Sequence, residues 1–140
     1  MRIKATRYHD FSMGHRVCEH EGKCAMLHGH NYRIHFYCEG EQLDLLGRVI
    51  DFSVIKERLC NWLEDNWDHR FMMWSKDPKM PMVRNADPSL VEVEFNPTAE
   101  NMGEFLLSVV APAQLIGTGV VCTKVVIEET RKCSVEVILK

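Results

Sequence analysis

The sequence contains no long hydrophobic run and no apolar segment at its start. Hydrophobic residues make up 46% of the 140 residues, yet no stretch approaches the roughly 20 consecutive apolar residues that a membrane-spanning helix requires. The first eight residues, Met-Arg-Ile-Lys-Ala-Thr-Arg-Tyr, lack the apolar core of a signal peptide. We therefore expect a cytoplasmic protein that makes no contact with membranes.

Concentrated positive charge is also missing. The formal net charge is −3 at pH 7, and the Lys and Arg residues are scattered along the chain rather than clustered. Proteins that bind nucleic acids usually carry a basic patch or stripe. We expect no nucleic-acid partner.

The six cysteines show neither a CxxC pair nor the spacing of a zinc ribbon. Cys38, Cys60, Cys122 and Cys133 lie in segments with apolar patterning, where a reduced cysteine behaves as a small hydrophobic residue. We expect these cysteines to be reduced. Cys24 differs, because it lies beside a lysine and shortly before two histidines.

Length and periodicity predict one α+β domain over residues 1–140. A chain of this length buries a core of its own without division into several domains. Period-two alternation predicts four main strands, at residues 2–16, 30–39, 118–129 and 132–139. Apolar residues spaced by three and four predict one helix after Asp51 and a second after Thr98. Adjacent strands at each end of the chain favour an antiparallel sheet with both helices on one face.

The segment 75–96 carries three prolines, and this composition predicts that it contains no helix. Residues 90–95 alternate between apolar and acidic side chains. A short edge strand or hairpin is therefore expected there.

The strongest chemical signal is Cys24 followed by the sequence His28-Gly29-His30. Residues i and i+2 of a strand project from the same face, so the two imidazoles can bind one object. Two neutral imidazoles that point together are typical of a metal site, and the usual metal is zinc.

A third ligand is expected from the first strand. His15 shares the parity of Phe11 and Met13, and it is the best candidate. His20 and His35 are weaker alternatives, because His20 lies in a loop and His35 has the opposite parity to His30. Three histidines would leave a fourth position open, as in catalytic zinc sites.

Three further groups have more than one interpretation. Cys24 is a fourth ligand, a general base or an inert thiol. Asp68-His69, just after the first helix, is either a carboxylate-oriented imidazole or a solvated polar pair. Glu128-Glu129 ends an apolar strand, so one carboxylate is turned towards the buried side unless the strand frays into solvent.

Together these motifs resemble one family. Six short motifs occur in order along nearly the whole chain: Phe11-Ser12-Met13-Gly14-His15, Cys24-x-x-x-His28-Gly29-His30-Asn31, Asp51-Phe52, Asp68-His69, Pro97-Thr98-Ala99-Glu100-Asn101 and Glu128-Glu129-Thr130. Each motif alone is weak, but the ordered set resembles the family of 6-pyruvoyl-tetrahydropterin synthase and 6-carboxytetrahydropterin synthase. The resemblance implies the tunnelling fold (T-fold), a four-stranded antiparallel sheet with two helices on one face. It also implies subunits that join sheets edge to edge into barrels, commonly a hexamer that is a dimer of trimers, with active sites between subunits.

The resemblance also implies roles for seven residues. The zinc ligands of the family correspond to His15, His28 and His30, and its catalytic residues correspond to Cys24, Asp68 and His69. The family's pterin-anchoring glutamate precedes a threonine, and this selects Glu129 over Glu128.

The implied substrate is 7,8-dihydroneopterin triphosphate. The three-residue gap between Cys24 and His28 resembles the spacing in one branch of the family. Members of that branch form 6-carboxytetrahydropterin and release acetaldehyde and triphosphate, in the biosynthesis of queuosine and other 7-deazapurines. The alternative branch eliminates triphosphate and forms 6-pyruvoyl-tetrahydropterin. A third hypothesis is a catalytically silent module that binds pterin or metal. The chain departs from the common short pattern at Met72-Met73-Trp74 and by an insertion from about Ser75 to Phe95.

Overall fold

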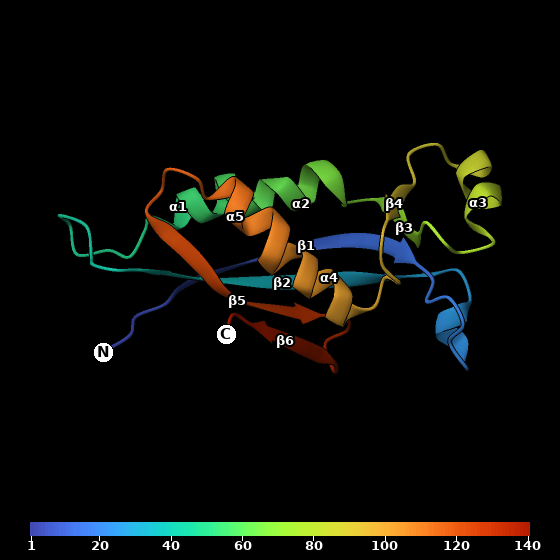
Figure 1. Cartoon of the computed structure of the whole chain (residues 1–140), viewed down its shortest axis with the longest axis horizontal. Coiled ribbons are helices and arrows are strands. Elements are labelled where there is room, and N and C mark those ends of the chain that lie inside the picture. Colours follow the sequence, from blue (N-terminus) through green and yellow to red (C-terminus); the bar gives the residue numbers. More distant parts are fainter.

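The computed structural model describes residues 1–140 and consists of one twisted six-stranded sheet with two long helical segments packed against it (Figure 1). The strand order is β4-β3-β1-β2-β5-β6. The strands are β1 (Ala5–His15), β2 (His28–Gly40), β3 (Arg70–Trp74), β4 (Val91–Val93), β5 (Val120–Glu128) and β6 (Ser134–Ile138). No helix has the length and apolar character needed to cross a membrane.

The sheet is mixed, which corrects the expectation of four antiparallel strands. β1, β2, β5 and β6 form the expected antiparallel part, with β1 and β2 paired from Ala5 opposite Cys38 to His15 opposite His28. β3 adds in parallel to β1, and β4 adds in parallel to β3. The sequence did not reveal β3, because Phe71-Met72-Met73-Trp74 is continuously apolar and has no period-two alternation.

The two predicted helices are present. The first runs without a break through α1 (Phe52–Ile55), η2 (Lys56–Cys60) and α2 (Asn61–Asn66), and the Asp51 carboxylate accepts the Ser53 N–H at 2.9 Å as its N-cap. The second runs through α4 (Ala99–Phe105), η3 (Leu106–Val110) and α5 (Ala111–Gln114). Its cap is Thr98, whose hydroxyl accepts the Asn101 N–H at 3.1 Å.

A third helix, α3 (Met80–Ala86), lies within the segment that we expected to contain none. Pro81 is at the second position of this helix, where the backbone N–H has no intrahelical partner in any case. The prediction was wrong because proline is unfavourable in a helix interior but not in its first turn. The short edge strand expected at residues 90–95 is β4.

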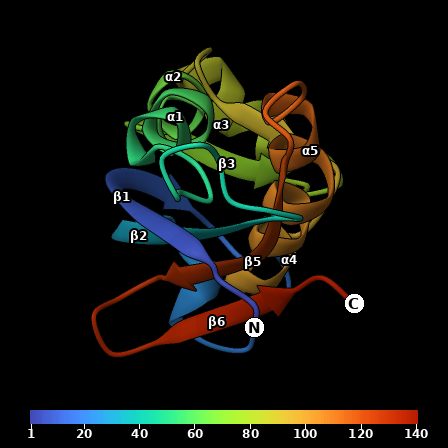
Figure 2. The same ribbon diagram turned by 90° about the vertical axis from the view of Figure 1, so that its left-hand side faces the viewer.

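Both long helices cover the same face of the sheet (Figure 2). That face carries the fully buried side chains of Tyr32, Ile34 and Phe36 from β2, and these pack with Leu59 and Leu106 of the helices in one core cluster. Strand alternation extends this buried face to the ends of β1 and β2, where the histidines lie. The first strand thus brings His15 to the same side as its core residues.

The antiparallel part of the sheet has two edges with unpaired backbone groups, one on β1 and one on β6. β1 contacts β3 only from Met13 to His15, so its earlier residues have no neighbouring strand on the side away from β2. β6 is the outermost strand at the opposite border. Open strand edges pair readily with another chain.

Candidate metal centre and its surroundings

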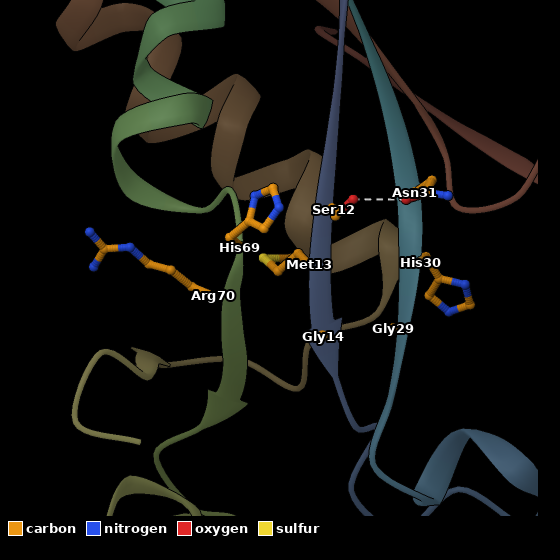
Figure 3. A pocket seen from close by; sticks show the side chains of 8 residues that line it. All are labelled: Ser12, Met13, Gly14, Gly29, His30, Asn31, His69 and Arg70. Atoms are coloured by element: carbon orange, nitrogen blue, oxygen red, sulfur yellow. Dashed lines mark hydrogen bonds between the residues drawn. The ribbon is translucent and has the colours of Figure 1, made fainter. Parts of the chain in front are cut away.

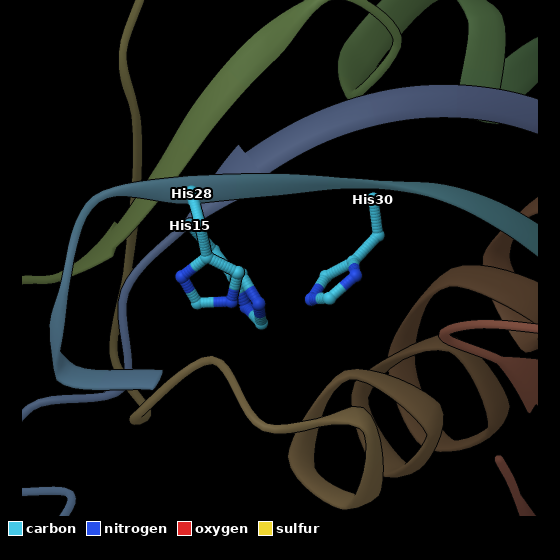
Figure 4. A group of neighbouring side chains, drawn as sticks. All are labelled: His15, His28 and His30. Carbon is cyan, nitrogen blue, oxygen red and sulfur yellow. The ribbon is translucent and has the colours of Figure 1, made fainter. Parts of the chain in front are cut away.

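Three imidazoles converge where β1 ends and β2 begins (Figure 4). His15 lies opposite His28 in the strand register, and Met13 lies opposite His30. One ligand atom from each histidine lies within 4.8 Å of the other two. This spacing suits three ligands of a single ion, with ring nitrogens about 2.0–2.1 Å from a zinc.

Backbone carbonyl groups orient two of the rings. His15 Nδ1 is 2.8 Å from the Pro97 carbonyl oxygen, and His28 Nδ1 is 2.7 Å from that of Met26. A carbonyl only accepts, so each ring carries its proton on Nδ1 and presents the lone pair of Nε2 to the cluster. This arrangement fixes the tautomer that a metal ligand requires.

Two nitrogens of the cluster lack a hydrogen-bond partner. The Nε2 atoms of His28 and His30 are buried, and neither makes a hydrogen bond. Buried polar atoms without a partner are rare in proteins and cost free energy. A divalent cation would satisfy both atoms, so the donor set fits a metal ion.

Burial lowers the pKa of two of the three imidazoles, those of His15 and His30. Burial lowers the pKa of His15 to about 4, although the hydrogen bond to Pro97 opposes this shift, and the charges of His28 and His30 lower the pKa further. Burial also lowers the pKa of His30, against an opposing effect of Glu129. A metal binds the neutral imidazole, so no proton has to be displaced from these two rings at neutral pH.

Glu129 is the one of the two adjacent glutamates that faces the cluster. Its Oε1 atom is 3.3 Å from His30 Nε2, without the geometry of a hydrogen bond. Glu128 projects to the opposite face of the sheet and contacts His35, with 2.5 Å between Oε2 and Nε2. Glu129 also lines a cavity of about 160 Å³ together with residues at the start of α4 and β6, namely Ala99, Glu100, Cys133, Ser134 and Val135.

Cys24 lies in the single turn η1 (Lys23–Ala25), which precedes β2. Its carbonyl oxygen accepts the Val17 N–H at 2.7 Å and so closes the loop between β1 and β2. The Cys24 thiol is half-buried and unpaired. It lies close enough to Tyr32 to raise the pKa of that hydroxyl, after the larger effects of burial and Glu129.

Tyr32 also belongs to this environment, although it was not among the candidate site residues predicted from the sequence. Its side chain is fully buried, and its hydroxyl oxygen is 3.3 Å from His15 Nδ1 and 3.4 Å from Nε2. The hydroxyl group is therefore shared between the two nitrogens of the His15 ring. Its parity with His28 and His30 was the signal that could have identified it.

Asp68 and His69 form a second group, beyond the C-terminal end of α2. Asp68 Oδ2 is 2.8 Å from His69 Nδ1, and Asp68 Oδ1 accepts the Ser12 N–H at 3.0 Å. Burial raises the pKa of Asp68, but the hydrogen bonds with His69 and Ser12 outweigh it, so the net pKa is lowered. Asp68 is therefore ionised at neutral pH and orients the His69 ring.

Within one chain the His69 ring points away from the ring of His30. The His69 side chain is 79% exposed, and it lines a cavity that Ser12, Asn31 and His30 also line. Figure 3 shows His69 on one side of β1 and the His30 ring on the far side of β2, pointing away from it. His69 also adopts a left-handed backbone conformation, with φ of +59°, which is uncommon for a residue with a side chain.

Comparison with known proteins shows to which family this chain belongs. The family described as 6-pyruvoyl tetrahydropterin synthase matches residues 4–138. The chain belongs to this family. The family contains relatives named 6-carboxy-5,6,7,8-tetrahydropterin synthase from Rickettsia conorii and Rickettsia felis, which are 35% and 34% identical over 137 residues and align with 96% of this chain and 99% of theirs.

Solved structures of other proteins show the same fold. An uncharacterised protein from Wolinella succinogenes superposes with a TM-score of 0.88 over 100% of this chain and 99% of its own, at 22% identity. The 6-pyruvoyl tetrahydropterin synthase from Caenorhabditis elegans superposes with a TM-score of 0.72 over 100% and 97%, at 24% identity. The expected α+β fold of the family is therefore confirmed, with β3, β4 and α3 in addition to the expected elements.

Proposed function

We propose that the protein is a zinc-dependent 6-carboxytetrahydropterin synthase, which converts 7,8-dihydroneopterin triphosphate to 6-carboxytetrahydropterin, acetaldehyde and triphosphate. The observation that carries the proposal is the convergence of His15, His28 and His30, with two Nε2 atoms that lack partners. The Rickettsia relatives, which match along nearly their whole length, carry the name of this synthase. The queuosine or another 7-deazapurine pathway would consume the product.

The three histidines would hold the zinc. A borderline-soft cation with three imidazole ligands is typical of catalytic zinc sites, which keep one position open. When bound, zinc supplies a Lewis acid that stabilises negative charge on a substrate oxygen. The carbonyl groups of Pro97 and Met26 hold two of the rings in the orientation required.

The remaining residues of the site would bind the pterin and move protons. The Glu129 carboxylate offers two oxygens, which match the 2-amino and ring N–H groups of a pterin in a bidentate hydrogen bond. Cys24, as thiolate, would take a proton from the substrate side chain. His69, oriented by Asp68 at 2.8 Å, would carry a proton to or from a side-chain hydroxyl.

We propose further that the site is completed by a second copy of the chain, in a homo-oligomer of the hexameric type. Support comes from the position of His69, whose ring lies beside β1 while the His30 ring points away from it on the far side of β2 in one chain (Figure 3). The open edges of β1 and β6 offer the backbone groups through which neighbouring sheets would join into a barrel. Asp68 and His69 of one copy would then face the substrate held by another.

The alternative function is 6-pyruvoyl-tetrahydropterin synthesis, which the family description and the neighbouring structure from Caenorhabditis elegans name. The three-residue gap between Cys24 and His28 favours the carboxy-forming branch. Incubation of the zinc-loaded protein with dihydroneopterin triphosphate decides between them. Acetaldehyde and 6-carboxytetrahydropterin, detected by mass spectrometry, are the expected products; 6-pyruvoyl-tetrahydropterin without acetaldehyde would assign the protein to the other branch.

A catalytically silent binding module is tested with the Cys24→Ala variant. We expect this variant to keep its zinc and its affinity for the pterin but to lose turnover, because only the proton-transfer group is removed. Wild-type protein that binds zinc and pterin yet forms neither product would instead establish the silent module.

A further inference from the structure

Asn96 directly precedes the residue whose carbonyl binds His15, and its side chain is bound to the chain beyond β1. The Asn96 amide oxygen accepts the Cys18 N–H at 2.9 Å, and its amide nitrogen donates to the Cys18 carbonyl, also at 2.9 Å. Cys18 is buried and lies three residues after His15, in the loop that leaves β1. One side chain therefore fastens the segment ahead of Pro97 to the end of the strand that carries His15.

The backbone carbonyl of Asn96 is held independently of its side chain. It accepts the Thr98 N–H at 2.7 Å and the side-chain amide of Asn101 at 2.9 Å. The first of these bonds joins residues i and i+2, which is the pattern of a γ-turn with Pro97 at its centre. The proline ring fixes φ of that central residue, and the hydrogen bond across it restricts ψ. The direction of the Pro97 carbonyl is thus set by the hydrogen bonds of Asn96 and Asn101.

The His15 ring has a second neighbour that competes with this carbonyl. The Tyr32 hydroxyl lies 3.3 Å from His15 Nδ1 and 3.4 Å from Nε2. A hydroxyl both donates and accepts, so it can bind either tautomer of the ring, whereas the Pro97 carbonyl at 2.8 Å only accepts and requires the proton on Nδ1. Without that carbonyl, Tyr32 would donate to Nδ1, and the ring proton would lie on Nε2. A protonated Nε2 has no lone pair for a metal ion.

We propose that Asn96 and Asn101 are positioning residues for the metal centre. They hold the Pro97 carbonyl against His15 Nδ1, and this contact keeps the Nε2 lone pair of the ring free for the ion. Asn101 closes the motif of residues 97–101, so this motif serves the metal centre as well as the start of α4. The inference rests on the proposed function only for the identity of the ion. The tautomer of His15 is a property of the metal-free chain and is testable without zinc or substrate.

The first experiment determines the tautomer of His15 in the metal-free full chain at neutral pH. Long-range proton–nitrogen NMR correlation spectra distinguish the protonated ring nitrogen from the unprotonated one. We expect the wild-type ring to carry its proton on Nδ1 alone. Asn96→Ala removes both hydrogen bonds to Cys18, and Asn101→Ala leaves these two bonds intact but removes one donor to the Asn96 carbonyl. Both variants should populate the tautomer with the proton on Nε2, and Asn96→Ala should populate it more.

The second experiment measures the zinc affinity of the same proteins by competition with a chelator. Loss of a group that orients a metal ligand weakens metal binding by roughly 10–100-fold, and Asn96 acts through one further group. We therefore expect the zinc Kd to rise about tenfold in Asn96→Ala and less in Asn101→Ala. The matched control is Asp51→Ala, which removes the N-cap of the other long helix and so also costs stability, but leaves every hydrogen bond around Pro97 in place. Its zinc Kd and its His15 tautomer should equal those of the wild type.

Three results would overturn the proposal: a wild-type His15 ring protonated on Nε2, an unchanged tautomer in both asparagine variants, or an equal rise of the zinc Kd in Asp51→Ala. Asn96 would then only satisfy the backbone groups of Cys18. If Asn96→Ala does not fold, Asn101→Ala decides, because it keeps both bonds to Cys18. If the wild type binds no zinc, the metal of the proposed function fails, whereas the tautomer comparison still decides the role of the two asparagines.

Discussion

Gly14 connects the packing of the sheet to the metal cluster, and its replacement by alanine is the most direct test of that connection. The residue lies between Met13 and His15 and is paired with Phe71 of β3. A Cβ atom at this position would lie 2.4 Å from Cδ2 and 2.8 Å from Cε2 of Phe71, and 3.3 Å from the carbonyl oxygen of His28. Non-bonded carbon atoms normally remain about 3.5–4.0 Å apart, so the ring or the strand has to move.

The magnitude follows from two opposing effects. Insertion of an extra carbon into a packed position costs about 1–3 kcal/mol of stability. Replacement of glycine by alanine also restricts the unfolded chain, which stabilises the protein by about 0.4–1 kcal/mol. We therefore expect Gly14→Ala to lose about 1–2 kcal/mol in the wild-type background. In a Phe71→Ala background the collision is absent, and the same substitution should be neutral or slightly stabilising.

The assay is urea unfolding of the wild type, Gly14→Ala, Phe71→Ala and the variant with both substitutions, at one protein concentration and with zinc removed. These four proteins form a double-mutant cycle. The expected coupling between Gly14 and Phe71 is about 1–3 kcal/mol. Zinc affinity, measured by competition with a chelator, should weaken in Gly14→Ala because the adjacent His15 is displaced, and it should recover in the double variant. The same stability loss in both backgrounds would refute the assignment of the collision to Phe71.

Three other outcomes are expected. Zinc at 100 times its Kd should stabilise the wild type by about 2.7 kcal/mol and should stabilise His28→Ala much less. Thermal unfolding at several zinc concentrations measures both effects. Equal stabilisation of the two proteins would mean that zinc binds elsewhere. Arg33 donates to Asp10 at 2.8 and 3.0 Å and lowers the pKa of that carboxyl below its ordinary value of 3.8. The ionised pair therefore stabilises the folded state above pH 3.8, and this stability is lost as the pH falls through the lower pKa of the folded state. Asp10→Asn should flatten the profile of unfolding free energy against pH in that range, and an unchanged slope would contradict the assignment. The Asn96 side chain accepts the Cys18 N–H and donates to the Cys18 carbonyl, each at 2.9 Å. Asn96→Ala should therefore lower the free energy of unfolding, measured in urea, by about 1–3 kcal/mol. A loss below about 0.5 kcal/mol, the usual range of surface substitutions, would mean that water replaces both hydrogen bonds.

Local rules of the sequence predicted the parts of the site that depend on one or two strands. Alternation along β1 and β2 placed His15, His28 and His30 on one face, and the structure brings them within 4.8 Å. Alternation indicated only that Glu128 and Glu129 face opposite sides, and the family resemblance selected Glu129, which lies beside His30. Capping chemistry located the start of the helix at Thr98.

Other features depended on contacts between segments that are distant in the sequence. The carbonyl group that orients His15 belongs to Pro97, which is 82 residues away, and no periodicity reports such a contact. β3 forms because its backbone pairs with the end of β1, although its apolar run carries no alternation. The contact between His9 and Glu64 also exists only because α2 packs beside β1.

The sequence by itself therefore determined which three histidines form the cluster and the face on which they lie, because strand parity and residue chemistry are local properties. Only the tertiary structure decided which nitrogen each of His15 and His28 presents, because the carbonyl groups that bind their Nδ1 atoms are brought to them by the fold. It also decided that the His30 ring points away from His69 in one chain, because Asp68 and His69 are bound beside β1 whereas the His30 ring lies on the far side of β2 (Figure 3).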